Sequence, residues 1–317
     1  MLRSLNSGVT GVRQFQTSLD VIGNNLANIN TIGYKAGRVE FADTLLQTLR
    51  AATPDSGGGG AGGVSGVSAI QLGNGVELAA IKNSFTQGAV NQTGVHTDLA
   101  ISGDGFFIVK NPLTLEVFAT RAGDFRTDSS GFLVTNQGFR VQGFNAPPSL
   151  GATANYVDAD AIGDIRLDKG TVPASVIATS AAAATAGVQN INIDSSGKVN
   201  VLLTDGSQYT RGQILLQNFK NPNALLKQGN NLYGGLTTAG PAGGTATQTN
   251  PFGTAPSFAK ANTNGLGRID SGSLEISNVD ITREFSTMIT TQRAFQANAR
   301  VVAASDDMLQ EMINVVR

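Results

Sequence analysis

The stretch ITREFSTMITTQRAFQANARVVAASDDMLQEMINVV, residues 281–316, decides the architecture expected of this 317-residue chain. Apolar residues stand at every seventh position of it: Ile281, Met288, Phe295, Val302, Leu309 and Val316. A seven-residue period sustained over 36 residues predicts a helix of about 54 Å that packs along a partner helix, as in a coiled coil. Ser277, with Asp280 three residues later, resembles a capping box before this helix.

The partner helix is predicted at the other end of the chain, where Leu5, Val12, Leu19 and Leu26 are also spaced by sevens. Asparagines at 24–30 and Gly33 follow, and these residue types end helices. The two terminal stripes are expected to meet and to form an assembly interface. Its predicted members are Leu5, Val12, Leu19, Leu26, Ile281, Phe285, Met288, Phe295, Val302 and Leu309.

The polar faces of the two predicted helices carry few charges. Only Arg293 and Arg300 are charged between Phe285 and Ser305. A solvated helix face normally carries Lys and Glu, whereas small neutral side chains let other helices approach. We favour packing on more than one side of these helices, and the alternative is a simple antiparallel hairpin of the two chain ends.

Between the two ends the helical period disappears. Seven of the ten residues at 57–66 are glycine, and short β-branched and aromatic runs separated by turn residues follow from Asn74. The predicted class is α+β, with long N- and C-terminal helices paired as a coiled coil and an all-β body threaded between them. The expected division is a helical core with a Gly-rich extension, a β-rich middle domain and a small outer β-rich insertion: respectively 1–72 with 268–317, 73–149 with 205–267, and 150–204.

The composition excludes several function classes. Charged residues make up 14% of the chain and the net charge is -1, which gives no general attraction to nucleic acid. The absence of cysteine excludes disulfides and thiol catalysis. No run approaches the ~20 apolar residues of a membrane helix, and the opening MLRSLNSGVTGVRQ lacks the apolar core of a cleaved signal peptide. We therefore expect no membrane insertion and, if the chain is exported, no cleaved signal.

No reaction centre is recognisable. His96 is the single histidine, and Asp98 and Asp104 lie in strand-entry and turn contexts that favour capping over acid–base chemistry. The acidic segment 158–164 resembles a calcium loop, but Lys169 stands where a bidentate Glu is required. We predict no catalytic residue, no metal site and no cofactor, and hence no enzyme.

Four segments resemble the flagellar rod and hook axial protein family. They are SLDVIGNNLANINTIGYKAGRVEFADTL (18–45), TDLAISGDGFFIV (97–109), ATRAGDFRTDSSGFLVTNQG (119–138) and SGSLEISNVDITREFSTMITTQRAFQANARVVAASDDML (271–309). Three motifs are most like those of the hook protein: VIGNN, FADTL and GQILLQNFKNPNALLKQGNNLY (212–233). The Gly-rich insertion leaves a distal rod subunit as the alternative, and a secreted β-rich adhesin is a more remote one.

The resemblance implies a structural subunit of the bacterial flagellar hook. Such a subunit polymerises with itself into a helical tube that transmits torque from rod to filament and conducts exported subunits. In this family the paired terminal helices line the tube, the β domain forms a middle layer and an insertion faces outward. The implied partners are the rod and hook–filament junction proteins, the hook cap and the flagellar type III export apparatus. The implied location is the extracellular part of the basal body and hook.

Overall fold

The computed structural model of the chain describes residues 2–45, 47–52, 68–145, 162–168, 177, 183, 185–242, 259–263 and 265–315. The chain forms two compact units. A helical unit comprises Met1–Ala27, Ala36–Ser84 and Val279–Arg317, and a β unit comprises Asn28–Lys35 and Phe85–Asn278. The Gly-rich stretch 57–66 and residues 158–161 of the acidic segment lie outside the described residues.

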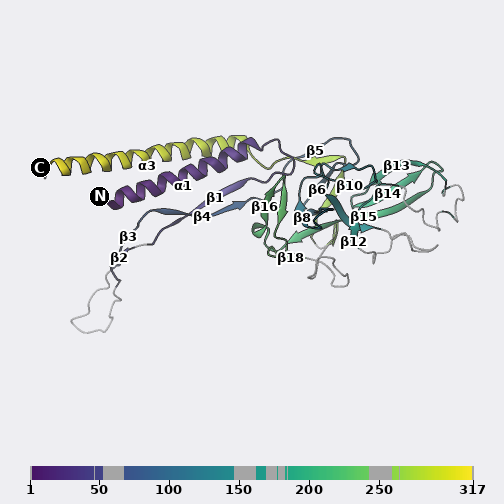
Figure 1. Ribbon diagram of the computed structural model, residues 1–317, viewed down its shortest axis with the longest axis horizontal. Helices are drawn as coiled ribbons and strands as arrows, with labels where there is room; N and C mark the ends of the chain where they lie inside the picture. The colour runs from purple at the N-terminus through teal and green to yellow at the C-terminus, as the bar shows by residue number, and fades with distance from the viewer. Residues whose placement is uncertain are drawn as a thin grey trace, which may run out of the picture. The chain divides into compact units, whose positions relative to one another are not determined.

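The described residues of the helical unit form two helices and two antiparallel strand pairs (Figure 1). Its elements are α1 (Leu2–Ala27), β1 (Gly37–Asp43), β2 (Gln47–Arg50), β3 (Ile70–Leu72), β4 (Val76–Asn83) and α3 (Ile281–Val315). The strands pair as β1 with β4 and β2 with β3. The helices run side by side in opposite directions, because Ser4 Oγ lies 3.5 Å from Ser305 Oγ while Asn25 Nδ2 donates to Glu284 Oε2 at 3.4 Å. Both predicted terminal helices are therefore present, and they lie against one another.

The start of α3 depends on one side chain. Asp280 Oδ1 accepts hydrogen bonds from the backbone N–H groups of Thr282 at 2.9 Å and Arg283 at 3.3 Å. These donors have no partner inside a helix, so an aspartate at this position satisfies them and also favours the positive end of the helix dipole. The seven-residue period gave the start at Ile281 correctly, but the predicted capping box of Ser277 and Asp280 is wrong, because Asp280 itself is the capping residue.

The strand pair of β1 and β4 lies along α1. The two strands pair antiparallel from Gly37 opposite Asn83 to Asp43 opposite Val76. Phe15 of α1 meets Phe41 of β1 edge to face, with ring centroids 5.9 Å apart. The Asn25 amide donates to Gly37 O at 2.8 Å and accepts from Gly37 N at 2.9 Å, which fixes the start of β1 to the end of α1.

The β unit is built on a 13-stranded antiparallel sheet whose central path is β13-β14-β15-β11-β7-β8-β17-β16. The strands before residue 165 are β5 (Val90–Gln92), β6 (Leu99–Ser102), β7 (Phe106–Lys110), β8 (Val117–Thr120), β9 (Arg126–Thr127), β10 (Leu133–Val134), β11 (Arg140–Asn145) and β12 (Ile162–Asp164). Those after it are β13 (Val188–Ile193), β14 (Lys198–Leu203), β15 (Gln208–Phe219), β16 (Leu226–Gly229), β17 (Leu232–Gly234), β18 (Pro241–Ala242), β19 (Ala259–Lys260), β20 (Arg268–Ser271) and β21 (Ser273–Glu275), with a short 3-10 turn η2 (Pro222–Ala224).

The α+β class is confirmed, but the described strands are divided differently from the expected domains. β13 and β14 fall within the predicted insertion, yet β14 pairs with β15 and so continues the main sheet. The described residues form two units where three were expected, and the separate outer insertion stays a prediction.

Strand β7 shows how the β unit is packed. Its apolar run FFIV is buried on both faces, as a continuous apolar run predicts. Phe107 and Val109 join one apolar cluster, and Phe106 and Ile108 join another on the opposite face. All four side chains are at most 2% exposed, so the β unit has its own core on both sides of this strand.

Candidate functional site

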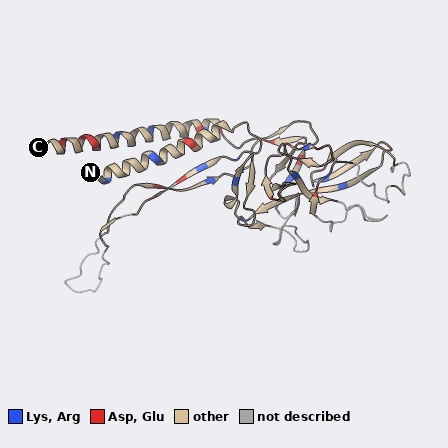
Figure 2. Cartoon of the chain, viewed as in Figure 1, with Lys and Arg blue, Asp and Glu red and all other residues tan. Residues whose placement is uncertain are grey.

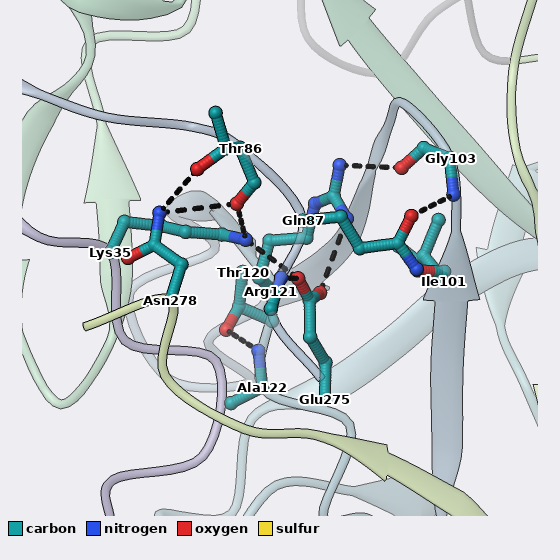
Figure 3. A network of polar contacts seen from close by, with 11 residues as sticks. Lys35, Thr86, Gln87, Ile101, Gly103, Thr120, Arg121, Ala122, Glu275 and Asn278 are labelled. Atoms are coloured by element: carbon teal, nitrogen blue, oxygen red, sulfur yellow. Dashed lines mark hydrogen bonds and ion pairs between the residues drawn. The ribbon is translucent and has the colours of Figure 1, made fainter. Parts of the chain in front are cut away.

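A buried cluster of three charged side chains is the most unusual feature of the β unit (Figure 3). Lys35 Nζ lies 2.6 Å from Glu275 Oε1, and Arg121 Nη1 lies 3.2 Å from Glu275 Oε2. The side chains of Lys35 and Glu275 are fully buried and that of Arg121 is 3% exposed. We call these three residues the ionic cluster.

Every charged group of the ionic cluster also bonds to the backbone. Glu275 Oε1 accepts from Gly88 N at 2.8 Å, and Lys35 Nζ donates to Thr86 O at 2.8 Å. Arg121 Nη2 donates to Gly103 O at 2.9 Å. Four segments that are distant in sequence therefore meet around one carboxylate, as the dashed contacts in Figure 3 show.

Two glycines allow the segments to approach this closely. Gly33 has a positive φ of 68°, and a Cβ there would lie 2.5 Å from the backbone nitrogen of Ala122. A Cβ on Gly88 would lie 2.0 Å from the carbonyl oxygen of Ile276. Only a residue without a side chain fits at such distances. The backbone bonds Gly33 N to Glu275 O and Ile276 N to Ala89 O, both 2.8 Å, depend on this approach.

The electrostatics of the ionic cluster are unbalanced. Two cations share one carboxylate, so the formal charge is positive. Burial lowers the pKa of the Lys35 amine from its ordinary value, and the Glu275 carboxylate opposes that shift. Removing one partner of a buried ion pair typically costs about 3–5 kcal/mol, because the other charge is left uncompensated.

Aromatic side chains pack beside the ionic cluster. The Arg121 guanidinium lies 5.3 Å from the centroid of the Phe106 ring, and Phe106, Phe85 and Tyr233 pack edge to face. Burial raises the pKa of the Tyr233 phenol, whose oxygen has no hydrogen-bond partner within the described chain. These surroundings exclude solvent, so the ionic cluster is suited to holding segments together rather than to acting on a substrate.

The sequence analysis did not single out this cluster, although a signal exists. Lys35, Arg121 and Glu275 each stand among small and apolar neighbours, in IGYKAG, FATRAG and SLEIS. In a chain with so few charges, a single charge within a buried strand or turn indicates a buried partner.

The predicted interface residues of α1 lie beside its most buried row. The buried residues of α1 are Gly8, Gly11, Ser18, Ile22 and Asn25. Leu5, Val12, Leu19 and Leu26 are only partly buried. A Cβ on Gly8 would meet Val302 Cγ2 at 2.9 Å, and one on Gly11 would meet Asn298 Nδ2 at 2.9 Å. Small residues of α1 therefore bring α3 close.

The predicted interface residues of α3 fall into two groups. Met288, Phe295, Val302 and Leu309 are partly buried, on the same side as the buried Thr291 and Ser305. Ile281 is 49% exposed and Phe285 is 46% exposed in the single chain. Their role in an assembly stays a prediction, since it concerns contacts between copies.

The two helices carry few charges (Figure 2), and α3 has several large apolar residues that are exposed. Large exposed residues of α3 beyond the predicted set are Ile289, Val301, Met308, Met312, Ile313 and Val315. An exposed apolar surface of this kind marks an interaction site in soluble proteins.

None of the residues weighed for chemistry is a member of the ionic cluster. His96 is exposed, and its carbonyl accepts from Ser271 Oγ at 3.2 Å. The Asp98 carboxylate accepts from Thr93 Oγ1 at 2.6 Å, while the Asp104 carbonyl accepts from Gly267 N at 2.7 Å. Among the described residues, no group of three or more His, Asp and Glu could hold a metal ion.

A search of the described helices finds none that is both long enough and apolar enough to span a membrane.

Three family models match the chain, each over a different part. "Flagella basal body rod protein" matches residues 5–35, "Flagellar hook protein FlgE/F/G D1 domain" matches 100–201, and "Flagellar basal body rod FlgEFG protein C-terminal" matches 270–315. Each matched segment supplies one member of the ionic cluster, since Lys35, Arg121 and Glu275 fall in the first, second and third. The ionic cluster thus joins the three segments that the family models match.

Curated relatives match over the whole chain. The chain is 36% identical over 317 residues to a flagellar basal-body rod protein FlgG of Bacillus subtilis, with 100% of both chains covered. It is 33% identical to FlgG of Caulobacter vibrioides, over 98% of this chain and 97% of that one. It is 27% identical to the flagellar hook protein FlgE of Treponema pallidum in an alignment of 485 residues that covers all of both chains.

The fold and the three matched segments define the class of protein to which this chain is similar, the structural proteins of the flagellar rod and hook. The chain belongs to the flagellar rod and hook protein family. Its relatives are structural rod and hook proteins of the flagellum, not enzymes.

Proposed function

We propose that this chain is a subunit of the flagellar distal rod and polymerises with itself into a helical tube. The observation that carries the proposal is the full-length match to rod proteins, which aligns all 317 residues of this chain with all of the Bacillus subtilis protein. The alignment with the hook protein extends to 485 residues and therefore contains long gaps. The sequence motifs favoured the hook protein, but these relatives give that preference no specific support. The hook subunit is therefore the second candidate.

The helical unit supports self-assembly. Its helices pack through small and polar residues and leave large apolar side chains such as Phe285 and Ile289 exposed. A second copy of the chain would cover such side chains, and a heterologous contact that does not close into a ring generates an open helical polymer. We propose that α1 and α3 pair as a coiled coil within that polymer and that neighbouring copies complete the burial.

The remaining assignments follow from the same proposal. The coiled coil would line the tube and the β unit would form the layer around it. The subunit would be exported through the flagellar type III apparatus without a cleaved signal, and would contact other rod and junction proteins in the basal body. A hook subunit would contact the hook cap and the hook–filament junction instead. The adhesin alternative is not retained, because the family is established over the whole chain.

Electron microscopy of the polymer tests the proposal, using purified basal bodies or concentrated protein. A short straight tube containing this chain would support the distal rod, whereas a curved tube would move the assignment to the hook. A soluble monomer under every assembly condition would overturn both. A matched truncation that removes residues 281–317 should abolish the polymer while leaving the β unit folded.

A further inference from the structure

We propose that Glu275 is a latch that closes the two ends of the β unit together: the segments 28–35, 85–89 and 272–278 become ordered as one piece, and only when Glu275 is in place. The inference concerns the isolated chain and does not rest on its assembly. It goes beyond an ordinary buried ion pair, because the two partners have unequal roles. The Glu275 carboxylate holds all three segments in place, whereas Lys35 holds only its own segment.

The first observation is where the contacts fall along the chain. The chain passes from one unit to the other at both ends of the segment 28–35, before Phe85 and after Asn278. Lys35 Nζ donates to Thr86 O, and Asn278 Nδ2 donates to the same oxygen at 3.2 Å and to Thr86 Oγ1 at 2.9 Å. All three connecting segments are therefore tied to one another within the β unit, as Figure 3 shows.

The second observation is that residue 275 contacts each of these segments. Its carbonyl accepts from Gly33 N, and its carboxylate accepts from Lys35 Nζ and Gly88 N. Lys35 reaches the segment 272–278 through the Glu275 carboxylate alone among the contacts drawn in Figure 3. Loss of the carboxylate therefore removes a contact from two segments, whereas loss of the amine leaves the carboxylate paired with Arg121.

The third observation is the separation of the partners along the chain. Lys35 and Glu275 are 240 residues apart. Until Glu275 arrives, burying Lys35 would leave a cation in an apolar site, which is strongly unfavourable. The segment that follows α1 must therefore wait for the segment that precedes α3, and the two close in one step.

The fourth observation is that β5 and β21 lie outside the hydrogen-bonded ladder of the main sheet. Among the described strands they pair only with each other, as a two-stranded sheet separate from the 13-stranded one. The core residues of β14 and β15, such as Val199 and Ile214, belong to the apolar cluster elsewhere in the unit. The latch segments can thus open while the main sheet stays folded, which is the behaviour of a local unfolding unit.

Hydrogen exchange of the full-length chain at neutral pH, followed by mass spectrometry, tests the latch. Glu275→Gln should accelerate exchange by about tenfold or more in peptides that cover 28–35, 85–89 and 272–278. Exchange in β14, away from the ionic cluster, should stay as in the wild type. Lys35→Met should accelerate exchange in 28–35 and leave 272–278 protected, because Glu275 keeps Arg121.

A matched control and a milder variant keep the test decisive. Asp270→Asn removes a more exposed ion pair on the neighbouring strand β20, 3.0 Å from Arg268 Nε, and should change none of the three segments. If Glu275→Gln does not fold, Glu275→Asp keeps the charge but shortens its reach, and should give the same three-segment pattern at smaller amplitude. Equal acceleration across all strands, or identical patterns for the lysine and glutamate variants, would overturn the proposal.

Discussion

The helical unit and the β unit bury their side chains in opposite ways. In the β unit, strand β7 is covered on both faces and Phe107 is fully buried. In the helical unit, α3 has only Thr291 and Ser305 buried, and both are polar. The largest apolar residues of α3, such as Phe285, remain substantially exposed. The β unit therefore has an apolar core of its own. The helical unit leaves large apolar side chains of α3 exposed, and we propose that other copies of the chain cover them.

This difference explains why the chain has so few charges on its helices. A helix that stays in water benefits from Lys and Glu on its outer face. A helix that will be enclosed by other helices gains from small neutral residues, which permit close approach. The β unit should therefore lose stability when its own core is altered, whereas alterations of the helical unit should mainly affect assembly.

The largest effect is expected in the core of the β unit. Phe107→Ala removes a fully buried ring that packs edge to face on Phe125, with centroids 5.2 Å apart. The free energy of unfolding should fall by about 3–5 kcal/mol, measured by urea denaturation with tyrosine fluorescence. Leu113→Ala, at a 91% exposed position, should change it by less than about 0.5 kcal/mol. A similar decrease in the free energy of unfolding for both variants would mean that the β unit has no core of its own.

A comparable effect is expected in the helical unit only after assembly. Phe295 is partly buried in the single chain. If neighbouring copies complete its burial, Phe295→Ala should raise the critical concentration for polymerisation by more than about 100-fold and leave urea unfolding of the β unit unchanged. Gln296→Ala, at an exposed neighbour, is the control. Assembly of the phenylalanine variant at the wild-type concentration would remove Phe295 from the interface.

A smaller effect should separate two glycines of α1. Alanine is favoured over glycine inside a helix by about 1 kcal/mol, and a Cβ on Gly23 meets nothing within 4 Å. Gly23→Ala should therefore stabilise α1. At Gly8 the new Cβ would meet Val302 at 2.9 Å, so Gly8→Ala should lose that gain by pushing α3 away. Helix content by circular dichroism and the critical concentration measure both, and equal stabilisation would mean that the two helices are not in close contact.

The smallest effect concerns pH and lies in the β unit. Burial, with a contribution from the Asp98 carboxylate, raises the pKa of Asp124, which accepts a hydrogen bond from the Asn136 amide. As the pH falls through this raised pKa, the folded protein takes up a proton that the unfolded chain does not yet bind, so this group favours folding increasingly.

Asp124→Asn should remove that contribution. Between about pH 6 and pH 4, the variant should therefore lose more stability than the wild type, by less than about 1 kcal/mol because the site is partly exposed. Thermal unfolding across this range measures the difference, with Asp104→Asn as the control. A parallel decline in variant and wild type would show that Asp124 does not titrate differently in the two states.

Much of the fold was readable from local pattern. The seven-residue period located α3, and the short β-branched and aromatic runs after Asn74 predicted an all-β body, in which FFIV forms part of β7. The pattern did not reveal which row of α1 faces its partner. Leu5 and its equivalents form the most apolar row, yet Gly8 and Gly11 make the close approach to α3. An apolar row shows that a helix has partners, and backbone proximity determines which partner lies closest.

The sequence by itself determined the class of this protein: helical ends with a seven-residue period, a β body, no reaction centre and the segments that identify the family. Tertiary structure alone decided that Lys35, Arg121 and Glu275 share one buried site. Periodicity reports which face of an element is buried, because it depends on neighbours a few residues apart. A contact between residues 240 positions apart depends on how the whole chain is threaded, and no local pattern contains that information.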